Sequence, residues 1–387
     1  RLIRRQRQMC IRDSLLFGQQ LAEWRLQLGR ILFAAGLAAY EISVVFCNSM
    51  ARQNWAWVQG VMSPVLEWLA FLCFGAKILF GTRYTWRELL AGGALYFIAR
   101  WVYFNSQNIW WIGIVVAVLA AKDVSLRRPL QVYFASGCAA MAVVLALHFA
   151  GIVAPDLTSE RMGALRGTYG YGHPNTFGGL VFGLVLAYAL LRAQKVRWVD
   201  CLLVFAVGVF LLVGPASRSA ALCTLALAVG LVFCRLRAGH SVPRWWPGTC
   251  AGMVGLTAAV SYLLPLLVIK VGPWNNDIGP AWLAKLDSLL TCRISLTWMA
   301  YRLLDVKIAG QVFNWPTVDN SFAFALFQFG PVVAALLGIL FAAALWGHAK
   351  QGRRVEVCCL FAMLAYAYME VPVSYTHLRA HETGAYL

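Results

Sequence analysis

Charge is scarce in this 387-residue chain, in which charged residues make up 13% and only 16 residues are acidic. Soluble domains carry about 25% charged residues, so this sequence has too little charge to cover a water-facing surface. A soluble globular enzyme is therefore excluded. A disordered chain is excluded too, because 61% of the residues are hydrophobic. The apolar runs are continuous over about 20 residues rather than alternating, which disfavours a transmembrane barrel and predicts an all-α polytopic membrane protein.

The two ends of the chain carry sequence that looks foreign to the rest. Residues 9–14 read MCIRDS and residues 373–378 read VSYTHL. These strings resemble translations of the two strands of one transposon mosaic-end sequencing adapter. We therefore expect residues 1–14 and 373–387 to be adapter-derived, and such segments carry no information about the fold. A single transmembrane domain is expected over residues 29–371.

About eleven apolar segments are expected to cross the membrane, since a helix needs about 20 apolar residues to span the bilayer core. They lie near residues 29–48, 61–80, 88–104, 107–121, 131–151, 176–192, 198–214, 219–234, 248–270, 319–345 and 355–371. Every second connection carries three basic residues, and the alternate short connections carry far fewer. The basic residues are Lys77, Arg83 and Arg87; Lys122, Arg127 and Arg128; Arg192, Lys195 and Arg197; Arg235, Arg237 and Arg244; and Lys350, Arg353 and Arg354. The positive-inside rule places these connections in the cytoplasm and the alternate ones outside.

Three outer loops then stand out, at residues 152–175, 214–220 and 271–318. The largest contains LDSLLTCRISLTWMAYRLLDVKIAG, whose apolar residues recur at helical spacing. This pattern predicts an amphipathic helix that lies at the membrane interface. The loops also hold five arginines, which are Arg161, Arg166, Arg218, Arg293 and Arg302. A guanidinium binds phosphate in a bidentate fashion and stays charged, so these residues either bind an anionic group or face water as ordinary loop charges.

The stretch GTYGYGHPNTFGG, residues 167–179, is dense in glycine. It is not a nucleotide-binding phosphate loop, because it lacks the GK[ST] ending and a preceding strand. Pro174 can occupy the first turn of the helix that follows, and the N-terminus of that helix would then favour an anion. His173 could act there as an acid or a base, or it could only cap the helix.

The longer string RGTYGYGHPNTFGG resembles the Arg-x-x-x-Gly-(aromatic)-x-His-Pro-Asn signature of bacterial oligosaccharide repeat-unit polymerases, in the O-antigen ligase and polymerase superfamily. GPASRSA resembles the Ser-Arg turn that follows the next span in that family. CRISLTWMAYRLLDVKIAG, followed by VDNSFAFALFQFG, resembles the end of the large outer loop and the start of the next helix. The three pieces follow the family's order, and the resemblance covers roughly residues 30–370.

The resemblance implies a glycosyltransferase C-like helical bundle in the bacterial cytoplasmic (inner) membrane, with its active site on the outer face. Such enzymes transfer a glycan from undecaprenyl diphosphate to a hydroxyl of an acceptor glycan, in the synthesis of capsule, exopolysaccharide or O-antigen. The implied partners are the undecaprenyl-diphosphate-linked oligosaccharide, the lipid bilayer and a chain-length regulator. Neither a nucleic acid nor a cofactor or metal is expected.

The resemblance also implies roles for particular residues. Arg166, Arg218 and Arg293 would neutralise the departing diphosphate, and His173 and Asp319 are the candidate bases. The expected substrate-binding residues are Arg161, Tyr171, Asn175, Arg302 and Asn320. An alternative for Asp319, Asn175 and Asn320 is that they cap their helices.

Two other functions stay open. An O-antigen ligase is one alternative, but the ligase branch is expected to have a functional histidine in the large outer loop, and residues 271–318 contain none. A flippase or transporter of the lipid-linked oligosaccharide is the other. Transporters often show repeated halves and interrupted helices, and neither is evident in this sequence.

Overall fold

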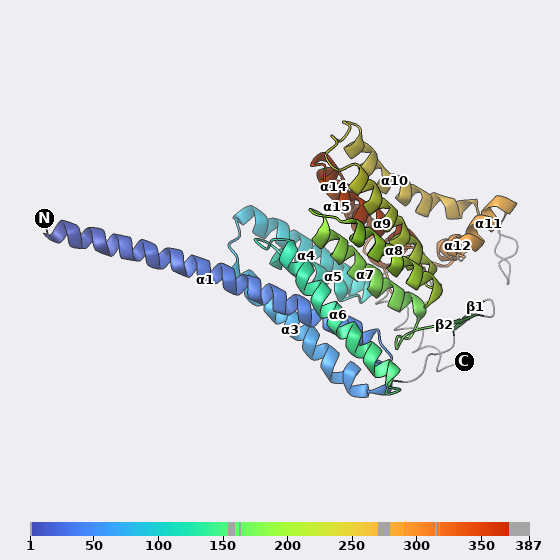
Figure 1. The fold of residues 1–387 in the computed structure, drawn as a ribbon, viewed down its shortest axis with the longest axis horizontal. Helices are drawn as coiled ribbons and strands as arrows, with labels where there is room; N and C mark the ends of the chain where they lie inside the picture. Colours follow the sequence, from blue (N-terminus) through green and yellow to red (C-terminus); the bar gives the residue numbers. More distant parts are fainter. Residues whose placement is uncertain are drawn as a thin grey trace.

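The computed structural model describes residues 2–153, 159–161, 164–269, 279–290, 292–313, 316 and 318–370, and it describes side chains from residue 23 onward except at 110, 159–161, 164 and 165. This part of the chain is a bundle of helices with one short hairpin (Figure 1). The α-helices are α1 (Leu2–Cys47), α2 (Ala51–Asn54), α3 (Ser63–Ala76), α4 (Trp86–Ser106), α5 (Trp110–Ala120), α6 (Arg127–Phe149), α7 (Pro174–Arg192), α8 (Trp198–Val213), α9 (Arg218–Leu236), α10 (Trp246–Leu263), α11 (Ala281–Leu289), α12 (Arg293–Leu303), α13 (Ser321–Phe329), α14 (Pro331–Lys350) and α15 (Arg354–Met369). Short π-helical turns, η1 (Val58–Met62) and η2 (Lys77–Gly81), extend α3 at both ends, and a 3₁₀ turn, η3 (Leu264–Leu267), extends α10.

Seven helical segments in the described part are long and apolar enough to cross a membrane, which confirms the prediction of an all-α membrane protein. They are Glu23–Cys47, Val58–Gly81, Arg127–Phe149, Pro174–Arg192, Arg218–Leu236, Trp246–Leu267 and Pro331–Lys350. Trp111–Ala120 and Trp198–Val213 are apolar but shorter. The expected count of about eleven spans therefore stays a prediction.

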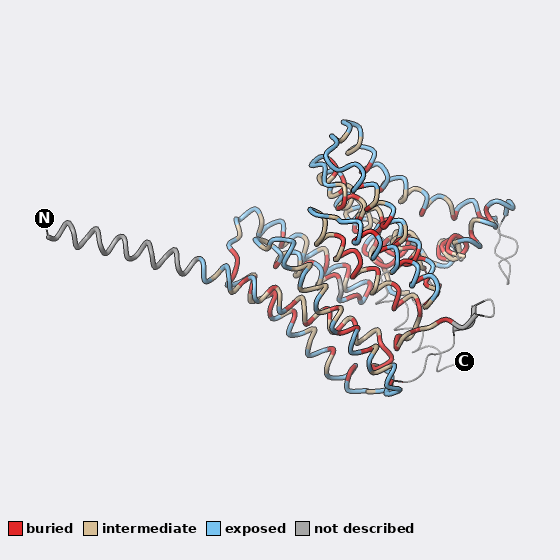
Figure 2. Tube along the Cα trace, in the orientation of Figure 1, coloured by how far each residue is buried: buried red, intermediate tan, exposed pale blue. Residues whose placement is uncertain are grey.

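The outer surface of the bundle is apolar. Leu72, Val213 and Ile339 expose 68%, 76% and 66% of their surfaces, and Figure 2 shows exposed residues along the outer faces of the helices. Water-soluble proteins rarely expose so much contiguous apolar surface. Lipid chains are a suitable environment for these side chains, so the exposed apolar surface agrees with the membrane location predicted from the apolar sequence.

The main core lies where α7, α8, α9 and α15 pack against one another and against α1 and α6. Small residues allow the helices to approach closely, as is common in membrane proteins. At Gly178 of α7, a Cβ would overlap the side chain of Ser217, which immediately precedes α9. This close approach brings the N-terminal ends of α7 and α9 together.

The basic connections gather in space. The turns after α7, α9 and α14 surround one polar cavity of about 720 Å³, lined by Gln194, His240, Lys350 and Arg353 among others. The turns after η2 and α5 also meet, since Lys122 Nζ donates to the Arg83 carbonyl oxygen at 2.8 Å. Figure 1 shows both groups at the end of the bundle away from the hairpin, α11 and α12. We call these the basic end and the site end.

The predicted outer loop 152–175 contains a hairpin that the sequence pattern did not predict. Strands β1 (Ser159–Arg161) and β2 (Ala164–Arg166) pair in antiparallel fashion, with Ser159 opposite Arg166. The hairpin ends at Arg166, so it fixes the backbone from which this arginine extends.

The segment predicted as one span over residues 319–345 is instead two helices, α13 and α14, so that prediction is wrong. The chain breaks at Gly330, whose φ is +85°. Only glycine fits here, because a Cβ would overlap the Ile308 carbonyl oxygen. Pro331 then starts α14, where its missing N–H costs nothing.

The single amphipathic helix expected in the large loop is also two helices. The chain leaves α11 at Leu289, takes a left-handed conformation at Cys292 with φ of +63°, and starts α12 at Arg293. Helix α12 ends at Leu303, so the last residues of the predicted helix are not helical. Apolar spacing did not reveal this break, because the residues on both sides of it continue the same pattern.

Replacing Gly330 by alanine should destabilise the protein by about 1–3 kcal/mol, the cost of holding an L residue in a conformation almost restricted to glycine. The measurement is the thermal unfolding midpoint of the purified protein in detergent micelles. Gly347→Ala is the matched control, since Gly347 also lies on α14 and open space surrounds its Cβ position. The control should be neutral or slightly stabilising. Equal midpoints for the two variants would contradict this account of the break.

Candidate functional site

Four helices begin around Glu370 at the site end. Asn175, Ser219 and Arg293, in the first turns of α7, α9 and α12, all reach the side chain of Glu370. Ser321, the first residue of α13, donates to the Glu370 backbone carbonyl at 2.5 Å. The first turn of a helix has unpaired N–H groups and a partial positive charge. Four such helix ends therefore create a setting that favours negative charge.

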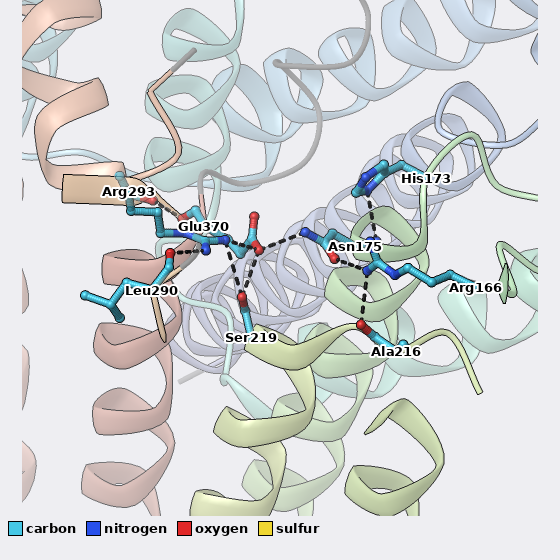
Figure 3. Close-up of polar contacts among 9 residues, drawn as sticks. Arg166, His173, Asn175, Ala216, Ser219, Leu290, Arg293 and Glu370 are labelled. Carbon is cyan, nitrogen blue, oxygen red and sulfur yellow. Dashed lines mark hydrogen bonds and ion pairs between the residues drawn. The ribbon is translucent and has the colours of Figure 1, made fainter. Parts of the chain in front are cut away.

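One oxygen of Glu370 receives three hydrogen bonds. Its Oε1 accepts from Arg293 Nη2 at 2.5 Å, from Ser219 Oγ at 2.9 Å and from Asn175 Nδ2 at 3.0 Å (Figure 3). The side chains of Arg293 and Glu370 are only 7% and 9% exposed, so they form a buried ion pair. Removing one partner of such a pair costs about 3–5 kcal/mol, because the other charge is left buried and uncompensated.

A second arginine reaches the same group through an amide. Arg166 Nη2 donates to Asn175 Oδ1 and to the Ala216 carbonyl oxygen, both at 3.0 Å. Its side chain is buried. Asn175 therefore bridges Arg166 to Glu370, and the charge of Arg166 also acts on the Glu370 carboxylate. The structure thus places Arg166 and Arg293, two of the three arginines that we expected to meet, in one hydrogen-bonded network.

The position of Arg293 depends on a buried acid in the preceding helix. Asp287 of α11 accepts from Ile294 N at 2.8 Å, from Ser295 N at 3.2 Å and from Ser295 Oγ at 2.7 Å. It thereby caps α12 in place of Cys292, which makes no side-chain cap. Arg293 Nη1 also donates to the Leu290 carbonyl oxygen at 2.7 Å. These bonds fix the guanidinium against the turn between the two helices.

His173 caps α7. Its Nδ1 accepts a hydrogen bond from Asn175 N at 3.1 Å, and Pro174 occupies the first position of the helix, as expected. This hydrogen bond is the helix-capping role that we gave as the alternative for His173. It also holds the backbone of Asn175, whose side chain links the two charged groups.

Asp319, the other expected base, is half-buried and lies close enough to Glu370 for their charges to interact. Arg218 is the first residue of α9 and is exposed, so it lies outside the buried network although the next residue, Ser219, is part of it. Successive helical residues point about 100° apart, since 3.6 residues make one turn. This is why Ser219 faces inward while Arg218 does not.

Three expected substrate-binding residues make contacts other than those of the Glu370 network. Tyr171 is fully buried in the main core with its ring 5.6 Å from that of Phe177, and no surface is left for a substrate. Asn320 caps α13 by accepting from Phe322 N and Ala323 N, which is the capping alternative. Arg302 is exposed and lies over the Trp298 ring at 5.3 Å.

The remaining expected residue, Arg161, ends strand β1, and its side chain lies outside the described residues. Within the described ranges, no group of three or more histidine, cysteine, aspartate or glutamate side chains could hold a metal ion. The side chains that meet around Glu370 present guanidinium, amide, hydroxyl and carboxylate groups.

Sequence reasoning missed Glu370, Ser219 and Asp287. A signal for Glu370 was present, because a lone carboxylate next to an apolar span is a functional candidate by default. Ser219 lies in the GPASRSA string, in which only the arginine was selected. Asp287 carried no such signal, since its role depends on the chain break at Cys292, which the apolar pattern did not reveal.

Replacing Asp287 by alanine should loosen α12 and lower stability by about 1–3 kcal/mol, because buried N–H donors lose their acceptor. Hydrogen exchange followed by mass spectrometry should then show faster exchange of the amides of residues 293–303 than in the native protein. Asp305→Ala is the control, since Asp305 is exposed beyond the end of α12. Unchanged exchange over α12 in Asp287→Ala would show that this cap does not hold the helix.

Comparison with known proteins identifies no relative of this chain. No protein-family model, no curated protein and no solved structure matches it. The resemblance of the outer-loop motifs to repeat-unit polymerases thus gains no support from these comparisons, and the function has to be argued from the geometry of the site.

Proposed function

We propose that this protein is a membrane glycosyltransferase that polymerises glycan repeat units. It would transfer a glycan from undecaprenyl diphosphate to a hydroxyl of an acceptor glycan, on the outer side of the bacterial cytoplasmic membrane. The observation that carries the proposal is that α7, α9 and α12 each donate a hydrogen bond from the first turn to the carboxylate of Glu370, while a second buried arginine, Arg166, joins the same network through Asn175. This arrangement suits an anionic group better than a neutral one.

The placement of the positive groups supports a diphosphate as the ligand. Arg166 and Arg293 bring two guanidiniums to the network, and the carboxylates of Glu370, Asp287 and Asp319 lie in or beside it, so the support comes from where the donors point and not from a net positive charge. The starts of the four helices add partial positive charge. In the proposed reaction the difficult feature is the negative charge that develops on the departing diphosphate. Fixed positive groups that stabilise such charge lower the barrier without having to reorganise.

Arg218 has a different role from the two buried arginines. It is exposed at the start of α9 and has no partner in the described part of the chain, so its guanidinium is available to an incoming anion. It lies next in sequence to Ser219 of the network. We infer that Arg218 meets the donor first and that Arg166 and Arg293 hold it during transfer.

The location of the site supports an extracytoplasmic reaction. The network lies at the site end, and the basic connections lie at the opposite end of the bundle (Figure 1). Because basic connections favour the cytoplasm, the site end would face outward. A polymerase is favoured over a ligase because residues 271–318 contain no histidine.

Arg166→Lys and Arg293→Lys should each lower the rate of glycan transfer by on the order of 10²–10³, the loss seen when one donor to a developing charge is removed. Lysine keeps the positive charge, so it avoids leaving Glu370 uncompensated, but it loses the planar fork. The measurement uses purified protein and an undecaprenyl-diphosphate repeat unit, and it follows polymer length and released undecaprenyl diphosphate.

Lys285→Ala is the control for this experiment, because Lys285 is an exposed cation on α11, beside the segment that holds Arg293. Its rate should stay within about twofold of the native rate, as expected for a surface change away from the site. Native rates in both arginine variants would remove the basis of the proposal. Transfer of a single glycan without elongation would point to a ligase, and lipid translocation without transfer would point to a flippase.

A further inference from the structure

The carboxylate of Glu370 lies where hydrogen-bond donors converge, although burial raises its pKa above the ordinary value of a glutamate. Three donors from α7, α9 and α12 converge on its Oε1, and the charges of Arg166 and Arg293 act on it. The proposed donor would need the same positive groups for its diphosphate. Glu370 and the donor therefore compete for Arg293.

The two oxygens of Glu370 differ in their contacts. Oε1 accepts all three side-chain bonds, whereas Oε2 accepts none from the described residues, and Figure 3 shows it directed away from the donors. Ser321 holds the backbone of Glu370 through its carbonyl oxygen. One oxygen is thus fixed by three hydrogen bonds, and the other keeps its capacity to accept a proton.

Arg293 has capacity for a second acceptor. Its Nη1 and Nη2 are bonded to the protein, but its Nε is buried and has no partner among the described residues. A buried N–H without an acceptor is unfavourable by about 1–3 kcal/mol. A phosphate oxygen is the kind of acceptor that a guanidinium binds with two parallel N–H groups.

We propose that Glu370 is the base that takes the proton of the acceptor hydroxyl, and that Arg293 keeps it inactive until the donor's diphosphate pairs with Arg293. This inference rests on the proposed function. Burial raises the pKa of the Glu370 carboxyl, and the charge of Arg293 opposes that rise by stabilising the charged form, so the carboxylate is a poorer proton acceptor while it is paired. Donor binding transfers the arginine to phosphate and thereby frees the carboxylate.

The acceptor oxygen forms a bond to the anomeric carbon of the donor sugar, and its proton goes to Oε2 of Glu370, which becomes neutral. The bond between the anomeric carbon and the diphosphate oxygen breaks, and the electron pair leaves with the diphosphate. Arg293 is then compensated by the diphosphate instead of by Glu370. Loss of the proton to water and release of the lipid diphosphate restore the original ion pair.

The test is Glu370→Gln in purified protein. Glutamine keeps a carbonyl oxygen for the three donors but cannot take a proton. We expect the transfer rate to fall by on the order of 10²–10⁴, the usual contribution of general base catalysis. Binding of undecaprenyl diphosphate, measured separately, should become roughly fivefold to tenfold tighter, since Arg293 no longer has a competing charged partner.

Glu356→Gln is the matched control, because Glu356 is a half-buried carboxylate at the other end of α15, beside the basic-end cavity. It should change neither the transfer rate nor the binding. A merely structural role for Glu370 would instead weaken lipid binding together with transfer, and that result would overturn the inference. Transfer in Glu370→Gln at close to the native rate would overturn it as well.

If native protein shows no transfer at all, the proposed function fails, and the inference about Glu370 fails with it. If native protein is active and only the Glu370→Gln results disagree, the proposed function stands without this base. Should Glu370→Gln not fold, a structure of native protein with undecaprenyl diphosphate decides the question. Arg293 bonded to phosphate and separated from Glu370 would support the inference, and an intact Arg293–Glu370 pair beside bound lipid would contradict it.

Discussion

The buried ion pair between Arg293 and Glu370 is the interaction on which the site end depends. It joins the start of α12 to the end of α15, and the same carboxylate oxygen also binds the first turns of α7 and α9. A buried ion pair is a weak source of stability, because desolvation offsets most of the attraction between the charges. The position of the Arg293–Glu370 pair is therefore better explained by the binding of an anion than by a contribution to folding stability.

The rest of the fold can be understood as support for that arrangement. Gly178 lets α7 and α9 approach closely, so that Asn175 and Ser219 reach one oxygen. Asp287 caps α12 and places Arg293 at its first position. At Gly330 the chain breaks between α13 and α14, and the separate α13 starts at Ser321, which holds the backbone of Glu370. Each of these contacts brings a helix start to Glu370, either to its carboxylate or to its backbone carbonyl.

Part of this could be predicted from the sequence. The apolar runs predicted the helices, because the bilayer demands long apolar segments. Pro174 marked the start of α7, and the motifs of the outer loops pointed to Arg166, Asn175 and Arg293. The break at Gly330 could not be read from hydropathy, which is high on both sides of it. The sequence also could not show that Ser219 points into the bundle and Arg218 does not, because this depends on how α9 is rotated against its neighbours. Glu370 carried a signal as a lone carboxylate next to an apolar span, but the sequence could not show its partners, which come from distant parts of the chain.

The central claim is that the helix starts around Glu370 bind a lipid diphosphate. Native mass spectrometry of the purified protein, with undecaprenyl diphosphate and uncharged undecaprenol compared at equal concentration, tests it most directly. The account predicts that the diphosphate lipid is retained at least about tenfold more strongly, and that Arg293→Lys removes most of this preference. Equal retention of the two lipids by the native protein would contradict it.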